Sequence, residues 1–155
     1  MLIILLTLFL GLMLTLMMLP LGYIAPEWIL LINIYWAIAL PSNTKMLLAF
    51  VSGFFVDIVL GQPLGISSLS FVIFVYIILS LYNSLRYMTV PQQMIVLFIL
   101  LIVKQHFFIW TFYMFGLDMD YQALIISSFI TAALWPLIYF SLRYVRRKWV
   151  VNEGL

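Results

Sequence analysis

The sequence predicts an all-α membrane protein in which six transmembrane helices form one compact bundle. Hydrophobic residues make up 67% of the chain and charged residues only 8%, whereas soluble domains carry about 25% charged residues. The mean hydropathy is +1.25. The apolar runs are continuous, without the alternation of a membrane β-barrel, and they leave no room for a soluble domain. We therefore expect a single integral membrane domain over residues 1–155.

Six segments are long enough, or nearly long enough, to cross a bilayer, which takes ~20 apolar residues. Each junction between them carries Pro, Gly, Asn or Asp, which favour turns. The segments are residues 2–19, 28–40, 45–60, 65–82, 92–115 and 121–144. The first lacks the basic start and cleavage site of a secretory signal, so we expect it to remain as a span. The second and third are short, and either cross fully or form a re-entrant pair.

The charged residues predict the orientation of the bundle. Six of the seven Lys and Arg fall on one side of a six-span topology, at Lys45, Arg86, Arg143, Arg146, Arg147 and Lys148. Three of the acids, Glu27, Asp118 and Asp120, fall on the other side. Basic loops stay in the cytoplasm, so both termini are expected there. The C-terminal basic tail either anchors the end of the chain at anionic phospholipid or docks a cytoplasmic protein.

A row of small residues lies along the third segment. Ala49, Gly53, Asp57 and Gly61 follow at intervals of four and share one helix face, and Gly65 continues the series past the turn. Small residues at this spacing allow close helix packing in lipid, so these five are candidates for a packing or partner interface. Asp57 either caps the helix end near Gly61 or makes a fixed polar contact inside the bundle or with a partner.

Lys104 stands alone in the apolar run 94–115, and Asp57 stands alone in the run 46–60. Ions inside the bilayer cost about 2.5–3.5 kcal/mol at a helix centre and mark functional sites by default. Both residues lie 12 positions into their segments, ~18 Å from the cytoplasmic end. Equal depth permits an Asp57–Lys104 ion pair. Lys104 could instead snorkel or face a water-filled cavity.

The remaining polar residues predict no chemistry. His106 is the only histidine and there is no cysteine, so a metal site is not expected, and we assign His106 to hydrogen bonding or packing. The serines belong to no nucleophile elbow or triad pattern. We expect no catalytic residue, cofactor or nucleic-acid partner. Pro136 removes one hydrogen bond inside the sixth segment and predicts a kink there.

Three stretches in order give the chain a family resemblance. Residues 26–41 (PEWILLINIYWAIALP), residues 53–65 (GFFVDIVLGQPLG) and residues 134–136 (LWP) with the basic tail after them are similar to the rod shape-determining MreD family, especially its gammaproteobacterial type. The resemblance runs nearly the full length of the chain. Lys104 lies outside these three stretches, so the ion-pair hypothesis rests on this sequence alone and not on the resemblance.

The resemblance implies a non-enzymatic scaffold of the cell-elongation complex in the bacterial inner membrane, where peptidoglycan is made along the side wall. Its implied partners are MreC, bound directly through its membrane helix, and the MreB filament, RodA and a penicillin-binding transpeptidase as members of the complex. The implied fold is similar to the substrate-binding subunits of energy-coupling-factor vitamin transporters, a six-helix bundle with a pocket that opens outward.

That similarity leaves a second function open, a membrane subunit that binds a small molecule or lipid. Its pocket would be lined by aromatic residues such as Tyr23, Trp28, Phe112 and Tyr113. Pockets of this kind are mostly apolar, with a few placed polar groups.

Overall fold

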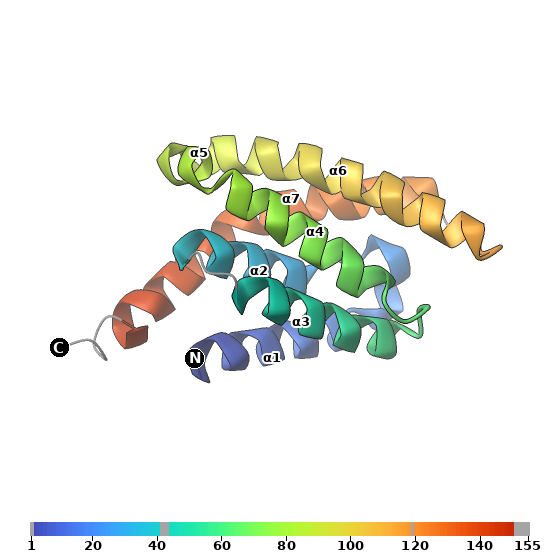
Figure 1. The fold of residues 1–155 in the computed structure, drawn as a ribbon, viewed down its shortest axis with the longest axis horizontal. Coiled ribbons are helices and arrows are strands. Elements are labelled where there is room, and N and C mark those ends of the chain that lie inside the picture. Colours follow the sequence, from blue (N-terminus) through green and yellow to red (C-terminus); the bar gives the residue numbers. More distant parts are fainter. Residues whose placement is uncertain (1, 41–43, 119, 151–155) are drawn as a thin grey trace.

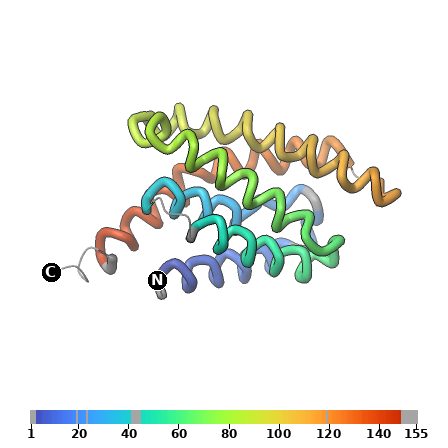
Figure 2. Tube along the Cα trace, in the orientation of Figure 1, coloured from blue at the N-terminus to red at the C-terminus, as the bar shows by residue number. Residues whose placement is uncertain are grey.

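The computed structural model describes residues 2–40, 44–118 and 120–150, which are helical almost throughout. Figure 1 shows the helices lying roughly side by side, and Figure 2 shows that they run alternately in opposite directions. The elements are α1 (Leu2–Met17), a 3₁₀ segment η1 (Leu19–Ile24), α2 (Trp28–Ala39), α3 (Thr44–Leu60), α4 (Ile66–Ser80), α5 (Tyr82–Tyr87), α6 (Val90–Met114), α7 (Tyr121–Val145) and a final π-helical turn, η2 (Arg146–Val150). The expectation of an all-helical protein is therefore confirmed.

The shortest of the long helices, α2, forms the centre of the core. It packs against α1, α3, α4, α5 and α7. Every residue from Trp28 to Ala37 is buried. Such a helix needs no polar face because other helices surround it. With 12 residues it is ~18 Å long, well short of the ~30 Å hydrocarbon core of a bilayer. Its start, at Trp28, lies within the bundle, whereas Leu40 after its last turn is 38% exposed.

Two antiparallel helix pairs, α3–α4 and α6–α7, make the most extensive contacts around this core. The turn between α3 and α4 uses Gly61 (φ 63°) and Gly65 (φ 101°), because both positions require the left-handed backbone that glycine adopts without strain. Thr89 and Gln92 form a capping box at the start of α6. Asp120 caps α7 by accepting from the amides of Gln122 and Ala123.

The expected segment 65–82 differs in the structure, because α4 ends at Ser80 and the separate helix α5 follows. Neither Pro nor Gly marks this break. Buried Gln93 of α6 acts further along the chain, near the end of α5, where it donates to the carbonyl of Leu85 at 2.9 Å while its own oxygen accepts from Trp135 Nε1 at 3.0 Å. Gln93 thus satisfies a backbone carbonyl that the end of α5 leaves open, and Trp135 of α7 holds the Gln93 side chain in place.

The outer faces of the helices are apolar. Exposed large side chains include Leu6 and Phe9 on α1, Phe50 on α3, Ile95 on α6 and Phe129 on α7. In a soluble monomer such continuous apolar surface would be unusual, whereas lipid covers it at no cost. Two of the described segments, α6 (Val90–Met114) and Tyr121–Lys148, are long and apolar enough to cross a membrane alone.

Candidate functional site

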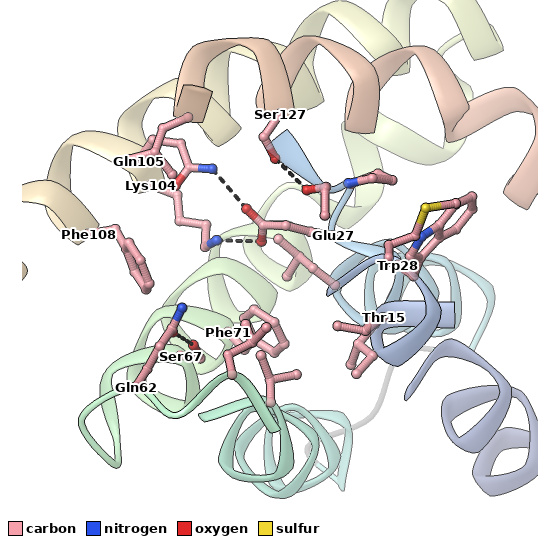
Figure 3. A pocket seen from close by; sticks show the side chains of 18 of the residues that line it. Thr15, Glu27, Trp28, Gln62, Ser67, Phe71, Lys104, Gln105, Phe108 and Ser127 are labelled. Carbon is pink, nitrogen blue, oxygen red and sulfur yellow. Dashed lines mark hydrogen bonds and ion pairs between the residues drawn. The ribbon is translucent and has the colours of Figure 1, made fainter. Parts of the chain in front are cut away.

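A polar cluster joins α6 to the start of the central helix. Glu27 accepts from Lys104 through one carboxylate oxygen and from Gln105 Nε2 through the other, at 2.9 Å for the second bond. The side chains of Lys104 and Glu27 are only 8% and 18% exposed. Figure 3 shows both α6 residues reaching toward the same carboxylate. The cost of the buried charges is reduced because each is paired and hydrogen-bonded.

The segment that carries Glu27 is fastened to α7. Thr131 Oγ1 accepts from the backbone amide of Glu27 at 3.2 Å. Ser127 Oγ donates to the carbonyl of Ala25 at 2.8 Å. Residues 25–27 lack a regular helical or strand partner, so these side-chain bonds satisfy backbone groups that would otherwise be buried without one. Glu27 therefore lies within the bundle beside Lys104, not in an outer loop as the six-span topology predicts.

The Asp57–Lys104 ion pair that equal depth would permit is not formed. Asp57 is fully buried and accepts from the amides of Gly65 at 2.8 Å and Ser67 at 3.0 Å. It stands in the last turn of α3, where the chain reverses, so the open amides at the start of α4 are its nearest donors. The polar contact of Asp57 is thus fixed and internal to the bundle. Asp57 caps α4, which follows it, and not α3, on which it lies.

The row of small residues on α3 faces α4. A Cβ added at Gly53 would lie 2.6 Å from Cα of Ser68 and 2.8 Å from its nitrogen, so the two backbones touch at this point. Ala49 is fully buried as well. Gly61 and Gly65 form the turn, where an added Cβ would meet nothing within 4 Å. The face considered for a partner helix is therefore occupied by the chain itself at Ala49 and Gly53.

A cavity of about 370 Å³ adjoins the Glu27–Lys104 pair. Figure 3 shows its side chains converging from several helices and from the segment between α1 and α2. Its walls are mainly apolar, including Val56, Leu60, Phe71, Phe108 and Leu124. Its polar lining comprises Thr15, Glu27, Gln62, Ser67, Lys104, Gln105 and Ser127, with the indole of Trp28. The size and lining are those of a small-molecule site.

Only part of the aromatic set expected for a pocket lines this cavity. Trp28 does. Phe112 instead packs with Ile66 and Phe108 in a small buried cluster, and Tyr113 is 74% exposed. The side chain of Tyr23 lies outside the described residues. Phe71 and Phe108 form the aromatic wall, each with its ring centroid within 6 Å of Lys104 Nζ (5.7 and 5.4 Å).

The other candidate residues lie away from this cluster. His106 is exposed, with Nδ1 2.8 Å from the carbonyl of Ile102 and Nε2 3.1 Å from the hydroxyl of Tyr121. Pro136 lies within α7, which continues through it as one helix. In the basic tail, Arg146 donates to the carbonyl of Ala39 at 3.2 Å and so caps the end of α2.

The rest of the tail lies around this contact. Arg143 stands over the ring of Tyr139 at 5.9 Å, and Arg147 and Lys148 are exposed. A role for the tail at lipid or at a cytoplasmic protein stays a prediction.

Sequence reasoning missed Glu27 and Gln105 as site residues. The available signal was the length of the second apolar segment, which is short for a span. A short central helix must begin below the surface, so an acid placed directly before it enters the bundle. Lys104 therefore pairs with Glu27, and not with Asp57 at the end of α3.

Comparison with known proteins identifies the family. The family described as rod shape-determining protein MreD matches residues 1–145. The rod shape-determining protein MreD of Haemophilus influenzae is 30% identical over 132 residues, which cover 83% of this chain and 81% of that protein. No solved structure matches the chain. The chain therefore belongs to the MreD family of rod shape-determining membrane proteins, which are cell-shape proteins and not enzymes.

Proposed function

We propose that this protein is a scaffold of the cell-elongation complex in the bacterial inner membrane, where it binds MreC directly and supports peptidoglycan synthesis along the side wall. Membership of the MreD family is the observation that carries the proposal. The MreB filament, RodA and a penicillin-binding transpeptidase are further members of the complex. The bundle crosses the membrane six times, with both termini in the cytoplasm.

The distribution of charge supports this orientation. In Figure 1, α1 begins and α7 ends at the same end of the bundle, and α5, with Arg86, lies at that end too. The turn between α3 and α4 and the end of α6, next to Asp118, lie at the opposite end. Basic residues on the cytoplasmic side would place Arg147 and Lys148 at anionic phospholipid headgroups.

The spanning helix of MreC would pack on the outer face of α3. Leu47, Phe50, Phe54 and Ile58 follow at helical spacing on this face, and each is at least 39% exposed. Aromatic side chains are enriched at protein interfaces. The opposite face of α3 is closed by α4, which leaves the outer face, where Val51 and Phe55 are exposed as well, for a partner helix.

The test is recovery of partners with the tagged protein from detergent-solubilised inner membrane, read by mass spectrometry. Stoichiometric MreC supports the scaffold. The double variant Phe50→Ala/Phe54→Ala should reduce MreC recovery severalfold, whereas the matched variant Ile95→Ala/Ile99→Ala on exposed α6 should not. Recovery of a pair of ATPases with a coupling membrane subunit, and no MreC, would overturn the proposal in favour of a vitamin-transporter subunit.

A further inference from the structure

Lys45, in the first turn of α3, is a buried cation without a counter-ion in the described part of the chain. The residue is only 6% exposed. No hydrogen bond or ion pair joins its ammonium group to any residue that the structure describes. Lysine is rarely buried to this extent unless it is paired, because burial removes water from the ammonium group. The unpaired charge therefore calls for an explanation.

The ammonium group of Lys45 can be reached from outside the chain. Its Nζ is not among the fully enclosed polar atoms, unlike Nε1 of Trp28. Lys45 precedes fully buried Ala49 by four residues, so its stem starts on the face of α3 that packs against α4. Side chains on a helix lean toward its N-terminus, so the charged end of this one is directed toward the start of α3.

The contact between α3 and α4 places Lys45 near a membrane surface. Gly53 touches Ser68 where the two antiparallel helices meet. Lys45 lies eight residues before Gly53, ~12 Å along α3. Tyr76 lies eight residues after Ser68, the same distance along α4, so it stands at the height of Lys45. Tyr76 is 58% exposed, and exposed tyrosine is typical of the level of lipid headgroups.

The charges around this point favour an anion. The N-terminus of α3 carries a partial positive charge, which adds to that of the ammonium group. Among the described acids, Asp57 lies at the opposite end of α3, and Glu27 pairs with Lys104, so neither balances Lys45. In Figure 1, α3 begins at the end of the bundle where α7 carries its basic residues.

Phosphate is the anion that a membrane supplies at this height. Its oxygens accept several hydrogen bonds, and the ammonium group has three to donate. A phospholipid with a choline or ethanolamine headgroup brings its own cation, which would lie close to Lys45 and repel it. A phospholipid with net negative charge brings no such cation. The membrane surface therefore offers an anionic phospholipid as the best match.

We propose that Lys45 binds the phosphate group of one anionic phospholipid where α3 begins and α4 ends. The ammonium group donates to the phosphate oxygens, and an acyl chain lies along the outer face of α4, where Leu69 and Ile73 are exposed. The site is separate from the basic tail of α7. It goes beyond the scaffold function, because it uses neither the outer face of α3 nor a partner protein.

The experiment compares two phospholipids that differ in charge. The purified protein, delipidated in a neutral maltoside detergent, is titrated with dioleoylphosphatidylglycerol or dioleoylphosphatidylcholine, and bound lipids are counted by native mass spectrometry. The two lipids share their acyl chains and phosphate group, but choline adds a positive charge. We expect the first phosphatidylglycerol to bind about tenfold more tightly than the first phosphatidylcholine. Equal affinities overturn the proposal.

Substitution of the lysine locates the site. Lys45→Met keeps the apolar stem but removes the charge, and should weaken binding of the first phosphatidylglycerol about tenfold. Arg86→Met is the matched control, because it removes one positive charge from an exposed side chain at the same end of the bundle. It should change the affinity less than twofold. Equal weakening by the two variants would show that overall charge attracts the lipid, and would overturn the site.

Thermal unfolding separates a lipid site from a structural lysine. Without lipid, Lys45→Met should unfold at the same temperature as the unchanged protein or higher, because it removes a buried, unpaired charge. Phosphatidylglycerol should raise the unfolding temperature of the unchanged protein but not that of Lys45→Met. A lower unfolding temperature of the lipid-free variant would reveal a partner within the protein and overturn the proposal.

Inorganic phosphate is the last arm of the experiment. It carries the same acceptor oxygens without acyl chains, so at the concentration of the lipid it should leave the unfolding temperature unchanged. A rise equal to that caused by phosphatidylglycerol would assign the site to a soluble phosphate and overturn the lipid assignment. Each of these measurements uses the protein without MreC, so their outcome is independent of the scaffold function.

Discussion

At the scale of single residues, the described part of the chain places its buried carboxylates where backbone or side-chain donors are already fixed. Glu27 accepts from Lys104 and Gln105, and its own amide donates to Thr131. Asp57 accepts from the first amides of α4. Sequence reasoning identified Asp57 and Lys104 as buried ions, because isolated charge in an apolar run is conspicuous. It could not identify their partners correctly, because the partner of each ion depends on the depth in the bundle at which the helices begin.

The Glu27–Lys104 pair should act as one unit in stability. Lys104→Met leaves a buried carboxylate with one neutral partner and should lower the free energy of unfolding by about 3–5 kcal/mol. Glu27→Gln/Lys104→Met removes both charges and should recover most of that loss. Denaturant unfolding in detergent, followed by circular dichroism, measures both. Equal losses in the single and double variants would contradict coupling between the two residues.

Asp57 should matter through the cap it provides. Asp57→Ala leaves the part-buried amide of Gly65 and the buried amide of Ser67 without an acceptor, at a cost of about 1–3 kcal/mol in unfolding free energy. The matched control is Asp120→Ala, which removes an exposed cap at α7 and should cost about 1 kcal/mol. The same unfolding assay compares them. A loss at Asp57 no larger than at Asp120 would show that burial does not strengthen the cap.

At the scale of elements, the sequence predicts helices well and their breaks less well. Continuous apolar runs between Pro, Gly, Asn and Asp indicate the helices that pack around α2. The break between α4 and α5 carries no such signal in the form of Pro or Gly, and the end of α5 is held by Gln93, on a different helix, through the carbonyl of Leu85. Short-range turn chemistry predicts only those ends that local residues determine. At the end of α5 a tertiary contact from α6 adds to them.

Helix contact should distinguish two glycines that look alike in sequence. Gly53→Ala would place a methyl group 2.6 Å from the backbone of Ser68, so α3 and α4 must separate, at about 1–3 kcal/mol. Gly11→Ala comes closest to the end of the Ile32 side chain, at 2.7 Å, which can rotate away. Alanine also favours helix by about 1 kcal/mol over glycine, so Gly11→Ala should be near neutral. Thermal unfolding in detergent, and rod shape in complemented cells, test the difference. Equal destabilisation would contradict the backbone contact.

At the scale of the whole molecule, composition predicts a membrane helix bundle but says little about its interior. A cavity beside a buried ion pair requires that α2 begin within the bundle, and that follows from packing of all the surrounding helices. The direction of the bundle in the membrane is a separate property, carried by the few charges at its ends.

That direction can be tested because the chain contains no cysteine, so each introduced thiol is unique. Leu64→Cys in the α3–α4 turn and Asp118→Cys after α6 should react with a membrane-impermeant maleimide in cells whose outer membrane has been permeabilised. Tyr87→Cys, 88% exposed at the end of α5, should react only after the inner membrane is opened. Six crossings with cytoplasmic termini require this pattern, and the reverse pattern would contradict the orientation.

The same labelling separates six full crossings from a re-entrant pair of α2 and α3. Both arrangements leave the two termini on one side, so only the connection between α2 and α3 distinguishes them. Leu40→Cys, at a position 38% exposed at the end of α2, probes that connection. Six full crossings place it at the cytoplasmic surface, where it should react like Tyr87→Cys once the inner membrane is opened. A re-entrant pair holds it within the bilayer, where an impermeant reagent reaches it poorly even then.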